Sequence, residues 1–238
     1  MSPSAEGRVP VVAVVTGATG GLGREIARGL VRAGMTVVLG VRDLPAGEAV
    51  AAELAREAGG GHVEALPLDL ASIASVRHFA GSVAARHSSI GLLINNAGAW
   101  FNTRRLSPDG HEMTLATNVL GPYVLTQELL PLLLAGVPSR IVNIVSAATS
   151  DYDTSDLDWE SRRFNGFKAY AQSKQALRHM TWALASRLES KGVAVNAVSP
   201  GFVKTAFLDH PEASSRRCCA CSCPLQLHPA RLRTLRSG

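Results

Sequence analysis

The stretch VVAVVTGATGGLGREIARGL, residues 11–30, decides the fold of this chain. Its β-branched apolar run predicts a buried strand, its glycines predict a turn, and the residues after them predict a helix that stops at Gly34. A strand, a glycine turn and a helix in this order are the context that a dinucleotide-binding site requires. Gly17 permits a tight turn, Gly21 a close backbone approach to a pyrophosphate, and Gly23 close packing of the helix on the strand. The N-terminus of the helix would offer free N–H groups to that anion.

The rest of the chain repeats the alternation of apolar runs and helical segments. The predicted strands are residues 11–16, 36–41, 62–67, 91–95, 140–146 and 193–199. The predicted helices are residues 21–34, 44–58, 71–87, 111–135 and 168–191, with Pro122 and Pro131 as points where the fourth could bend or break. The buried stripes are expected to be Leu22, Ile26 and Leu30 in the first helix and Leu177, Met180, Leu184 and Leu188 in the last. The pattern predicts an α/β fold, a single Rossmann-type, doubly wound parallel sheet with helices on both faces.

Composition and charge limit the classes of function. The chain has 238 residues, of which 46% are hydrophobic, and this is enough for one domain with a substantial core. Its net charge of +5 comes from 24 basic and 19 acidic residues, and five arginines lie after residue 213, so residues 1–213 hold 19 of each sign. The excess of basic residues therefore lies entirely after residue 213, and we expect no nucleic-acid partner.

The last part of the chain differs from the rest. After Asp209 neither helical nor strand periodicity continues, so we predict a dinucleotide-binding and catalytic domain at 1–210 and an irregular, basic, Cys-rich, disordered tail at 211–238. All four cysteines lie in the tail, at positions 218, 219, 221 and 223. Their spacing lacks the paired C-x₂-C arrangement of structural zinc sites, and His228 is a single extra candidate, so we expect no metal site.

The end of the second predicted strand bears on cofactor choice. Arg42 lies 19 residues after Gly23, close to the spacing of the residue that reads the adenosine ribose. An acid there would bind the ribose hydroxyls, whereas Val41 is apolar and Arg42 is suited to a 2′-phosphate. NADP is therefore favoured, and NAD is the alternative. Asp43 could instead pair with Arg42 or approach the ribose itself.

Candidate chemistry lies in the second half of the chain. Tyr170 and Lys174 are four residues apart at the start of a helical pattern, so they project from one face. An ammonium beside a phenol lowers the pKa of the phenol, which would make Tyr170 a usable general acid or base. Ser146 ends a predicted strand, and its hydroxyl could stabilise charge on a substrate carbonyl oxygen.

Two asparagine-containing segments add to this set. The sequence NNAG, residues 95–98, follows a strand at the carboxyl edge, where open α/β sheets bind ligands. Asn118 lies within an apolar helical pattern, where a polar side chain needs a specific partner.

From about Val11 to Thr205 the chain resembles the short-chain dehydrogenases/reductases. Their glycine motif, their Asn-Asn-Ala-Gly motif and their Tyr-x-x-x-Lys pair are all matched by the residues above. The resemblance implies that Ser146 orients and polarises the carbonyl, Tyr170 exchanges the proton, Lys174 tunes Tyr170 and holds the nicotinamide ribose, and Asn118 supports a proton-relay water. The expected cofactor-binding residues, Arg42 included, are Thr16, Gly17, Gly21, Leu22, Gly23, Arg42, Asp69, Leu70, Asn96, Ala97, Gly98, Tyr170, Lys174, Pro200, Gly201, Val203 and Thr205.

Within that family, GVRD, the Asp-rich segment before Tyr170 and PGFVKT look most like the branch of retinol-dehydrogenase-like and bacterial carbonyl-reducing members. The segment between Ser146 and Tyr170 is longer than in simpler members and should border the substrate. Its acids either bind a basic substrate group, such as an amino sugar, or simply face water.

The resemblance therefore implies an NADPH-dependent reductase that transfers hydride to a small-molecule ketone or aldehyde, or runs the reverse oxidation, with a ketoreductase of secondary metabolism as one form. The alternative is a non-catalytic dinucleotide-binding protein or an inactive truncated reductase, because the family's final edge strand and covering helices have no counterpart after Thr205. We interpret the tail as an out-of-frame C-terminus.

No membrane span is expected, since the most apolar segment, residues 129–137, is too short to cross a membrane. We expect a cytoplasmic protein that could dimerise through helices 111–135 and 168–191.

Overall fold

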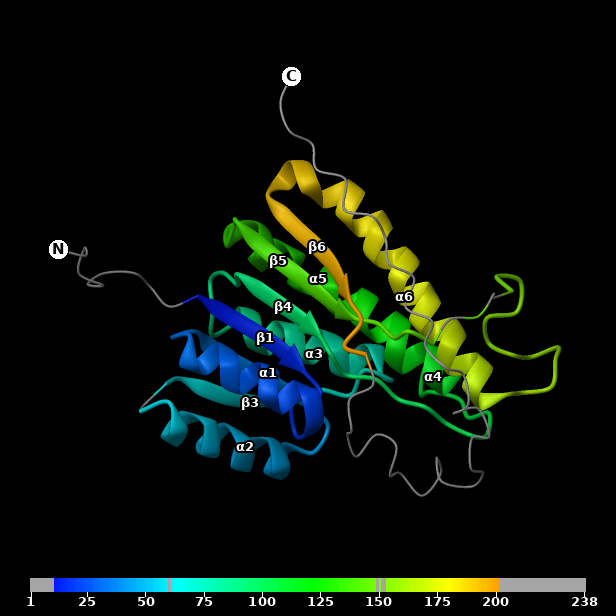
Figure 1. Cartoon of the computed structure of the whole chain (residues 1–238), viewed down its shortest axis with the longest axis horizontal. Helices are drawn as coiled ribbons and strands as arrows, with labels where there is room; N and C mark the ends of the chain where they lie inside the picture. Colours follow the sequence, from blue (N-terminus) through cyan, green and yellow to red (C-terminus); the bar gives the residue numbers. More distant parts are fainter. Residues whose placement is uncertain (1–10, 60, 149, 151–152, 202–238) are drawn as a thin grey trace, which may run out of the picture.

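The computed structural model describes residues 11–59, 61–148, 150 and 153–201, and in this part of the chain six parallel strands form one sheet (Figure 1). The strands are β1 (Val12–Thr16), β2 (Thr36–Val41), β3 (Val63–Pro67), β4 (Leu92–Asn95), β5 (Ser139–Ile144) and β6 (Val193–Val198). Their order is β3-β2-β1-β4-β5-β6, which is the doubly wound order of two mononucleotide-binding halves. The predicted fold class is confirmed.

The order of the strands reverses between β1 and β4. In register, Ala13 pairs with Val37 of β2 on one side and with Leu92 of β4 on the other. The chain therefore leaves β1 and β4 in opposite directions at the carboxyl edge, and this opens the crevice in which such sheets bind ligands.

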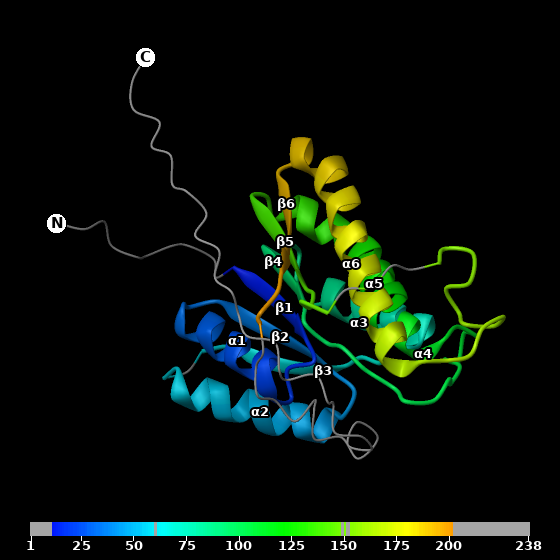
Figure 2. The same ribbon diagram turned by 45° about the vertical axis from the view of Figure 1, so that its right-hand side comes forward.

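The helices form two layers on the sheet (Figure 2). One face carries α1 (Gly21–Arg32) and α2 (Leu44–Glu57). The other carries α3 (Ile73–Ala84), α5 (Gly121–Ala135) and α6 (Gly166–Leu188). The short elements are α4 (Met113–Leu115), the π-helical turn η1 (Ala116–Leu120) and the 3₁₀ turn η2 (Glu189–Lys191).

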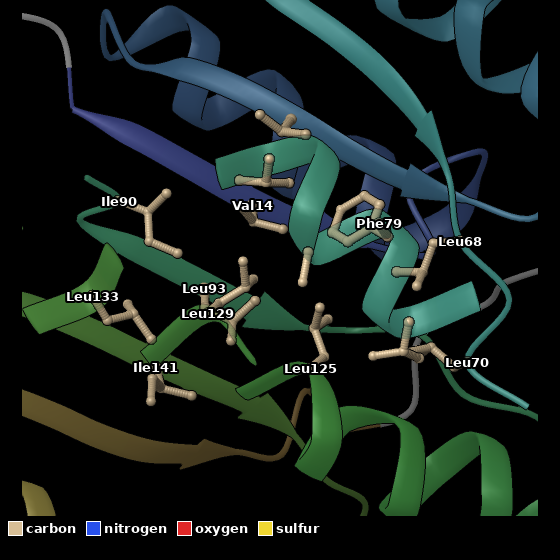
Figure 3. Close-up of a cluster of buried hydrophobic side chains, with 14 of the residues drawn as sticks. Val14, Leu68, Leu70, Phe79, Ile90, Leu93, Leu125, Leu129, Leu133 and Ile141 are labelled. Carbon is tan, nitrogen blue, oxygen red and sulfur yellow. The ribbon is translucent and has the colours of Figure 1, made fainter. Parts of the chain in front are cut away.

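Each layer encloses its own apolar core. Between the sheet and α3, α5 and α6, fully buried Phe79, Leu93 and Leu129 interdigitate (Figure 3). Burial of one such side chain stabilises the fold by about 1.5–3 kcal/mol, so this core fixes α5 and α6 against the strands that end at the candidate site.

The strands end within two residues of the predicted positions. The glycine stop predicted at Gly34 is also confirmed, because this residue adopts the left-handed conformation (φ 82°) just past α1, and Gly192 (φ 77°) does the same after η2. The buried stripe of α6 is confirmed at Leu177, Leu184 and Leu188, whereas Met180 is partly buried.

The stripe predicted for α1 was wrong by one residue. The fully buried residues of this helix are Gly23, Ala27 and Val31, while Leu22, Ile26 and Leu30 are partly buried at its flank. Small residues face the sheet because α1 begins directly after β1 and approaches it closely, which leaves the larger side chains to fill the gap beside it.

The predicted helix at 111–135 is interrupted. The chain forms α4, then the π-helical turn η1, and then α5, which continues through Pro131. The interruption lies just before Pro122, in the turn that holds Asn118. Gly121 comes so close to the Leu70 carbonyl that a β-carbon would overlap it. A π-turn inserts one residue into the helix, and such turns often occur at functional sites.

Several expectations lie outside the described residues. These are the tail at 211–238, its four cysteines, His228, and the absence of a strand after β6. None of the helices in the described part of the chain has the length and hydropathy that crossing a membrane requires.

Candidate active site

The glycine turn between β1 and α1 is built to receive an anion. Gly17 and Gly21 have φ values of 67° and 54°, which only glycine adopts without strain. A β-carbon on Gly23 would overlap the Gly17 carbonyl and approach Asn96 Nδ2 to 2.5 Å, so this glycine is required for close packing. Among the residues that the structure describes, no side chain caps the start of α1, and Gly20 and Gly21 are exposed. The first N–H groups of α1 are therefore available to a phosphate, as the sequence predicts.

Thr16 and Asn96 fasten this turn to the loop after β4. Thr16 Oγ1 accepts hydrogen bonds from the backbone N–H groups of Asn96 and Ala97, both at 3.1 Å. Asn96 Nδ2 in turn donates to the carbonyls of Thr16 (2.9 Å) and Gly17 (3.1 Å). The expectation that Thr16 contacts the cofactor needs correction, because its side chain has no exposed surface and can only shape the site.

The end of β2 carries an exposed cation. Arg42 is exposed, and Asp43 is the N-cap of α2, where its Oδ1 accepts from Ala46 N at 3.1 Å. Among the described residues Asp43 forms no ion pair with Arg42. The carboxylate caps a helix instead.

The predicted adenine contact divides into two parts. Asp69 is partly exposed, and its Oδ1 accepts from Ala71 N at 2.9 Å. The side chain of Leu70 lies in the hydrophobic core (Figure 3). The backbone of Leu70, rather than its buried side chain, is thus the part that could meet an adenine at this position.

Ser146 and Tyr170 meet at the carboxyl edge. Ser146 lies two residues beyond β5, Tyr170 lies in the second turn of α6, and their hydroxyls are hydrogen-bonded. Burial raises the pKa of Tyr170, and the hydrogen bond with Ser146 lowers it. The net direction is upward, so the phenol is protonated at neutral pH.

Lys174 lies one turn further along α6 and is buried, with 4% of its surface exposed. Its Nζ donates to the Ile144 carbonyl at 2.9 Å and lies 5.9 Å from the centroid of the Tyr170 ring. Burial lowers the pKa of Lys174 to about 8. The expectation that Lys174 lowers the pKa of Tyr170 was wrong for the cofactor-free protein, because the ammonium is directed to the end of β5 and burial dominates the phenol.

Asn118 forms hydrogen bonds with specific partners, as expected for a polar side chain in an apolar helical pattern. Its Oδ1 accepts from Ala99 N at 2.7 Å, and its Nδ2 donates to the Ala99 carbonyl and to Ser173 Oγ, both at 2.9 Å. Ser173 Oγ donates to the Tyr170 carbonyl at 2.7 Å. Ser173 was missed in the sequence, and its only signal was its place between the tyrosine and the lysine.

A second set of buried polar groups lies beneath these residues and was also missed. Asn95 Nδ2 donates to Asn143 Oδ1 (2.8 Å) and Thr126 Oγ1 (3.3 Å), and Asn143 Nδ2 donates to Thr181 Oγ1 (2.9 Å). All four side chains are buried. They connect β4 and β5 to α5 and α6, and so fix the strand ends against the helix that carries Tyr170.

The acids of the long segment before Tyr170 fall into two groups. Asp153 and Glu160 are exposed and face water, which is one of the two roles considered for them, whereas Asp156 and Asp158 form hydrogen bonds within the protein. Asp156 is buried and accepts from Glu160 N (2.7 Å) and from the Ser161 hydroxyl (2.9 Å). Asp158 Oδ1 accepts from Glu112 N at 2.8 Å. Asp156 therefore holds the segment's own backbone in place, and Asp158 ties the segment to the start of α4.

A hollow of about 850 Å³ lies elsewhere, at the amino ends of the strands, where it is lined by Val11, Gly91, Ser139 and Val193 among others. The motifs all lie at the opposite, carboxyl edge, so we assign the candidate site to that edge. Pro200 and Gly201 follow β6 toward this edge and are exposed, while Val203 and Thr205 lie outside the described residues.

The sequence matches known proteins over most of its length. A family model for short chain dehydrogenases matches residues 11–215. Human retinol dehydrogenase 13 is 40% identical over 199 residues, which cover 83% of this chain and 60% of that protein. The chain thus spans about 60% of the length of the curated relatives that it matches first.

Solved structures share the fold. A crystal structure of an uncharacterized protein from Mycobacterium paratuberculosis has a TM-score of 0.72 and 38% identity, covering 82% of this chain and 70% of that one. The structure of Pseudomonas aeruginosa RhlG, an active-site complex with NADP, has a TM-score of 0.68 and 29% identity, covering 85% and 78%.

Proposed function

Since the chain belongs to the short chain dehydrogenase family, we propose that it is an NADPH-dependent oxidoreductase that reduces a ketone or aldehyde, or oxidises the corresponding alcohol. The observation that carries this proposal is the hydrogen-bonded pair of Ser146 and Tyr170 next to the buried Lys174. These hydroxyls can both donate to one carbonyl oxygen, and a charge that develops on that oxygen is stabilised by such donors.

The cofactor would bind across the carboxyl ends of β1, β2 and β4. The N-terminus of α1 and the turn at Gly17–Gly21 would hold the pyrophosphate, and exposed Arg42 would pair with a 2′-phosphate. This supports NADP over NAD, as does the NADP bound to the P. aeruginosa relative. Bound nicotinamide dinucleotide would supply the hydride.

The chain's own residues would handle the proton. Tyr170, protonated at neutral pH because burial raises its pKa, would give its hydroxyl proton to the alkoxide oxygen. Ser146 would orient the carbonyl, and Lys174 would hold the nicotinamide ribose and stabilise the phenolate that remains. Asn118, which fixes Ala99 and Ser173 on either side, would support a water that returns the proton.

The substrate is proposed to be an apolar carbonyl compound or alcohol. The similarity to retinol dehydrogenase supports this class, while a ketoreductase role in secondary metabolism is a narrower form of the same proposal. We further propose a cytoplasmic protein that dimerises through α5 and α6.

The test is a Tyr170→Phe substitution. Loss of the hydroxyl removes the proton donor, so carbonyl-dependent oxidation of NADPH should fall roughly 10²–10⁴-fold. Binding of NADPH, followed by fluorescence, should be unchanged because the ring remains. Tyr123→Phe, which changes an exposed tyrosine on α5, is the matched control and should keep full activity.

Two outcomes would count against the proposal. Normal turnover by Tyr170→Phe would exclude the assigned proton donor. Tight NADPH binding by the unmodified chain without turnover of any aldehyde or ketone in a broad panel would favour the alternative, a dinucleotide-binding protein without catalysis.

A further inference from the structure

An aromatic side chain next to Tyr170 has no role in the proposed reaction. Trp100 stacks against Tyr170, with ring centroids 5.8 Å apart and an interplanar angle of 22°. Trp100 also contacts the ring of Phe167, with centroids 5.8 Å apart and an interplanar angle of 60°, and Phe167 is half exposed. The three rings therefore form a continuous apolar wall that runs from the reactive phenol outward to solvent.

The backbone before Trp100 is held firmly. Asn118 bonds to both the N–H and the carbonyl of Ala99, the residue immediately before it. The site thus uses one side chain, Asn118, to place both the tryptophan and, through Ser173, the helix that carries Tyr170.

The space for the indole depends on a glycine. A β-carbon on Gly166, the first residue of α6, would overlap the Phe101 carbonyl and lie 2.9 Å from Trp100 Nε1. Within the described residues Trp100 Nε1 is buried and has no hydrogen-bond partner, so packing rather than polar contact orients the ring. An indole held by packing against a catalytic ring is suited to recognise shape and flatness in a neighbouring group.

We propose that Trp100 determines substrate specificity, by stacking on a flat, unsaturated or aromatic group attached directly to the substrate carbonyl. The inference rests on the proposed function, because it places the carbonyl oxygen at Tyr170 and Ser146. With the oxygen there, one substituent of the carbonyl carbon must pass along the wall of Trp100, Tyr170 and Phe167. A flat unsaturated group can stack on the indole over its whole face, whereas a puckered ring of equal carbon count touches it only through C–H groups and gains no aromatic stacking.

The expected size of the effect follows from aromatic stacking. Such pairs contribute more than their buried area accounts for, and the excess corresponds to about a two- to twelvefold change in an equilibrium or rate constant. This excess should appear in the preference for a flat over a puckered substrate, and not in the absolute rate alone.

The experiment compares acetophenone with cyclohexyl methyl ketone. The ratio of their kcat/KM values is measured with NADPH for the unmodified chain, Trp100→Leu and Trp100→Phe, so that the different intrinsic reactivity of the two ketones cancels between variants. Trp100→Leu should lower the ratio about two- to twelvefold, and Trp100→Phe should restore most of it. Trp182→Leu, on an exposed part of α6, is the control and should leave the ratio unchanged.

A binding measurement separates this inference from the proposed function. The same two ketones are titrated calorimetrically onto the three forms of the protein saturated with NADP⁺, where no turnover occurs. If the binding preference for acetophenone falls in Trp100→Leu, the role of Trp100 in specificity is supported. This holds even if the unmodified chain reduces neither ketone, and in that case only the proposed function is refuted. An unchanged preference in Trp100→Leu, in both binding and turnover, would overturn the inference while leaving the role of Tyr170 intact.

Discussion

Lys174→Met should make the cofactor-free protein more stable while it removes the residue that we propose to hold the nicotinamide ribose. The ammonium of Lys174 is buried, and within the described residues its bond to the Ile144 carbonyl is not accompanied by an ion pair. Burial lowers its pKa from 10.5 to about 8, and each pKa unit corresponds to about 1.4 kcal/mol. At pH 7 the charge therefore costs about 3 kcal/mol of folding free energy.

The substitution also has a cost. Methionine has a similar length but cannot donate to the Ile144 carbonyl, and the loss of that hydrogen bond costs about 1 kcal/mol. The net stabilisation is then about 2 kcal/mol at pH 7, which for a chain of this size corresponds to a rise in Tm of roughly 4–8 °C.

The pH dependence has a definite sign. Because the pKa of Lys174 is lower in the folded protein than in the unfolded chain, the unfolded chain binds more protons between about pH 8 and pH 10.5. Stability therefore rises with pH through this window, and the penalty is complete below pH 8. The advantage of Lys174→Met should accordingly shrink from about 2 kcal/mol at pH 7 to about zero at pH 9.5.

The assay is thermal unfolding without cofactor at pH 7 and pH 9.5, followed by circular dichroism, and comparison of the two proteins cancels other titrating groups. Lys191→Met changes an exposed lysine after α6, and its stability should differ by less than about 0.5 kcal/mol at both pH values. A variant at position 174 that is less stable than the unmodified protein at pH 7 would refute the reasoning. So would an advantage that is equal at both pH values.

Two further predictions concern the framework of the site and its cofactor. Asn143→Leu keeps the number and branching of the side-chain heavy atoms but removes two buried hydrogen bonds and leaves Asn95 Nδ2 with only its 3.3 Å contact. The free energy of unfolding in urea should therefore fall by about 2–4 kcal/mol, while the exposed Asn196→Leu on β6 should change it by less than about 0.5 kcal/mol. Equal effects of the two would show that the buried set contributes nothing. Arg42→Ala should raise the KM for NADPH roughly 10–100-fold and leave that for NADH within about twofold, because only the 2′-phosphate loses a charged partner; a parallel rise for both would place Arg42 elsewhere.

Much of the site could be predicted from local sequence. The glycine turn requires φ values that only glycine adopts freely, so Gly17 and Gly21 were recognisable from their place between a strand and a helix. Asn118 was recognisable as a polar residue in an apolar pattern, and the structure confirms that it has buried partners. Neither the identity of those partners nor the π-turn that presents Asn118 could be predicted, because Ala99 and Ser173 are brought to it by packing of different elements.

The errors share a physical cause. The sequence around a loop carboxylate looks the same whether the group binds a ligand, faces water or accepts hydrogen bonds from nearby backbone. Asp156 accepts hydrogen bonds from nearby backbone because the fold buries it. Likewise, the spacing of a tyrosine and a lysine four residues apart predicts that the ammonium lowers the pKa of the phenol. Only burial shows that desolvation dominates the pKa of Tyr170 and Lys174.

The sequence by itself determined the order and type of the elements, the parallel doubly wound sheet and the edge at which the motifs meet, since these follow from periodicity, glycine conformation and chain direction. Tertiary structure alone decided what surrounds each motif: the carbonyl that takes the Lys174 ammonium, the wall that Trp100 forms beside Tyr170, and the buried set around Asn143. The reason is that hydrogen bonding, desolvation and stacking depend on distances between residues far apart in the chain, and those distances exist only once the helices have packed on the sheet.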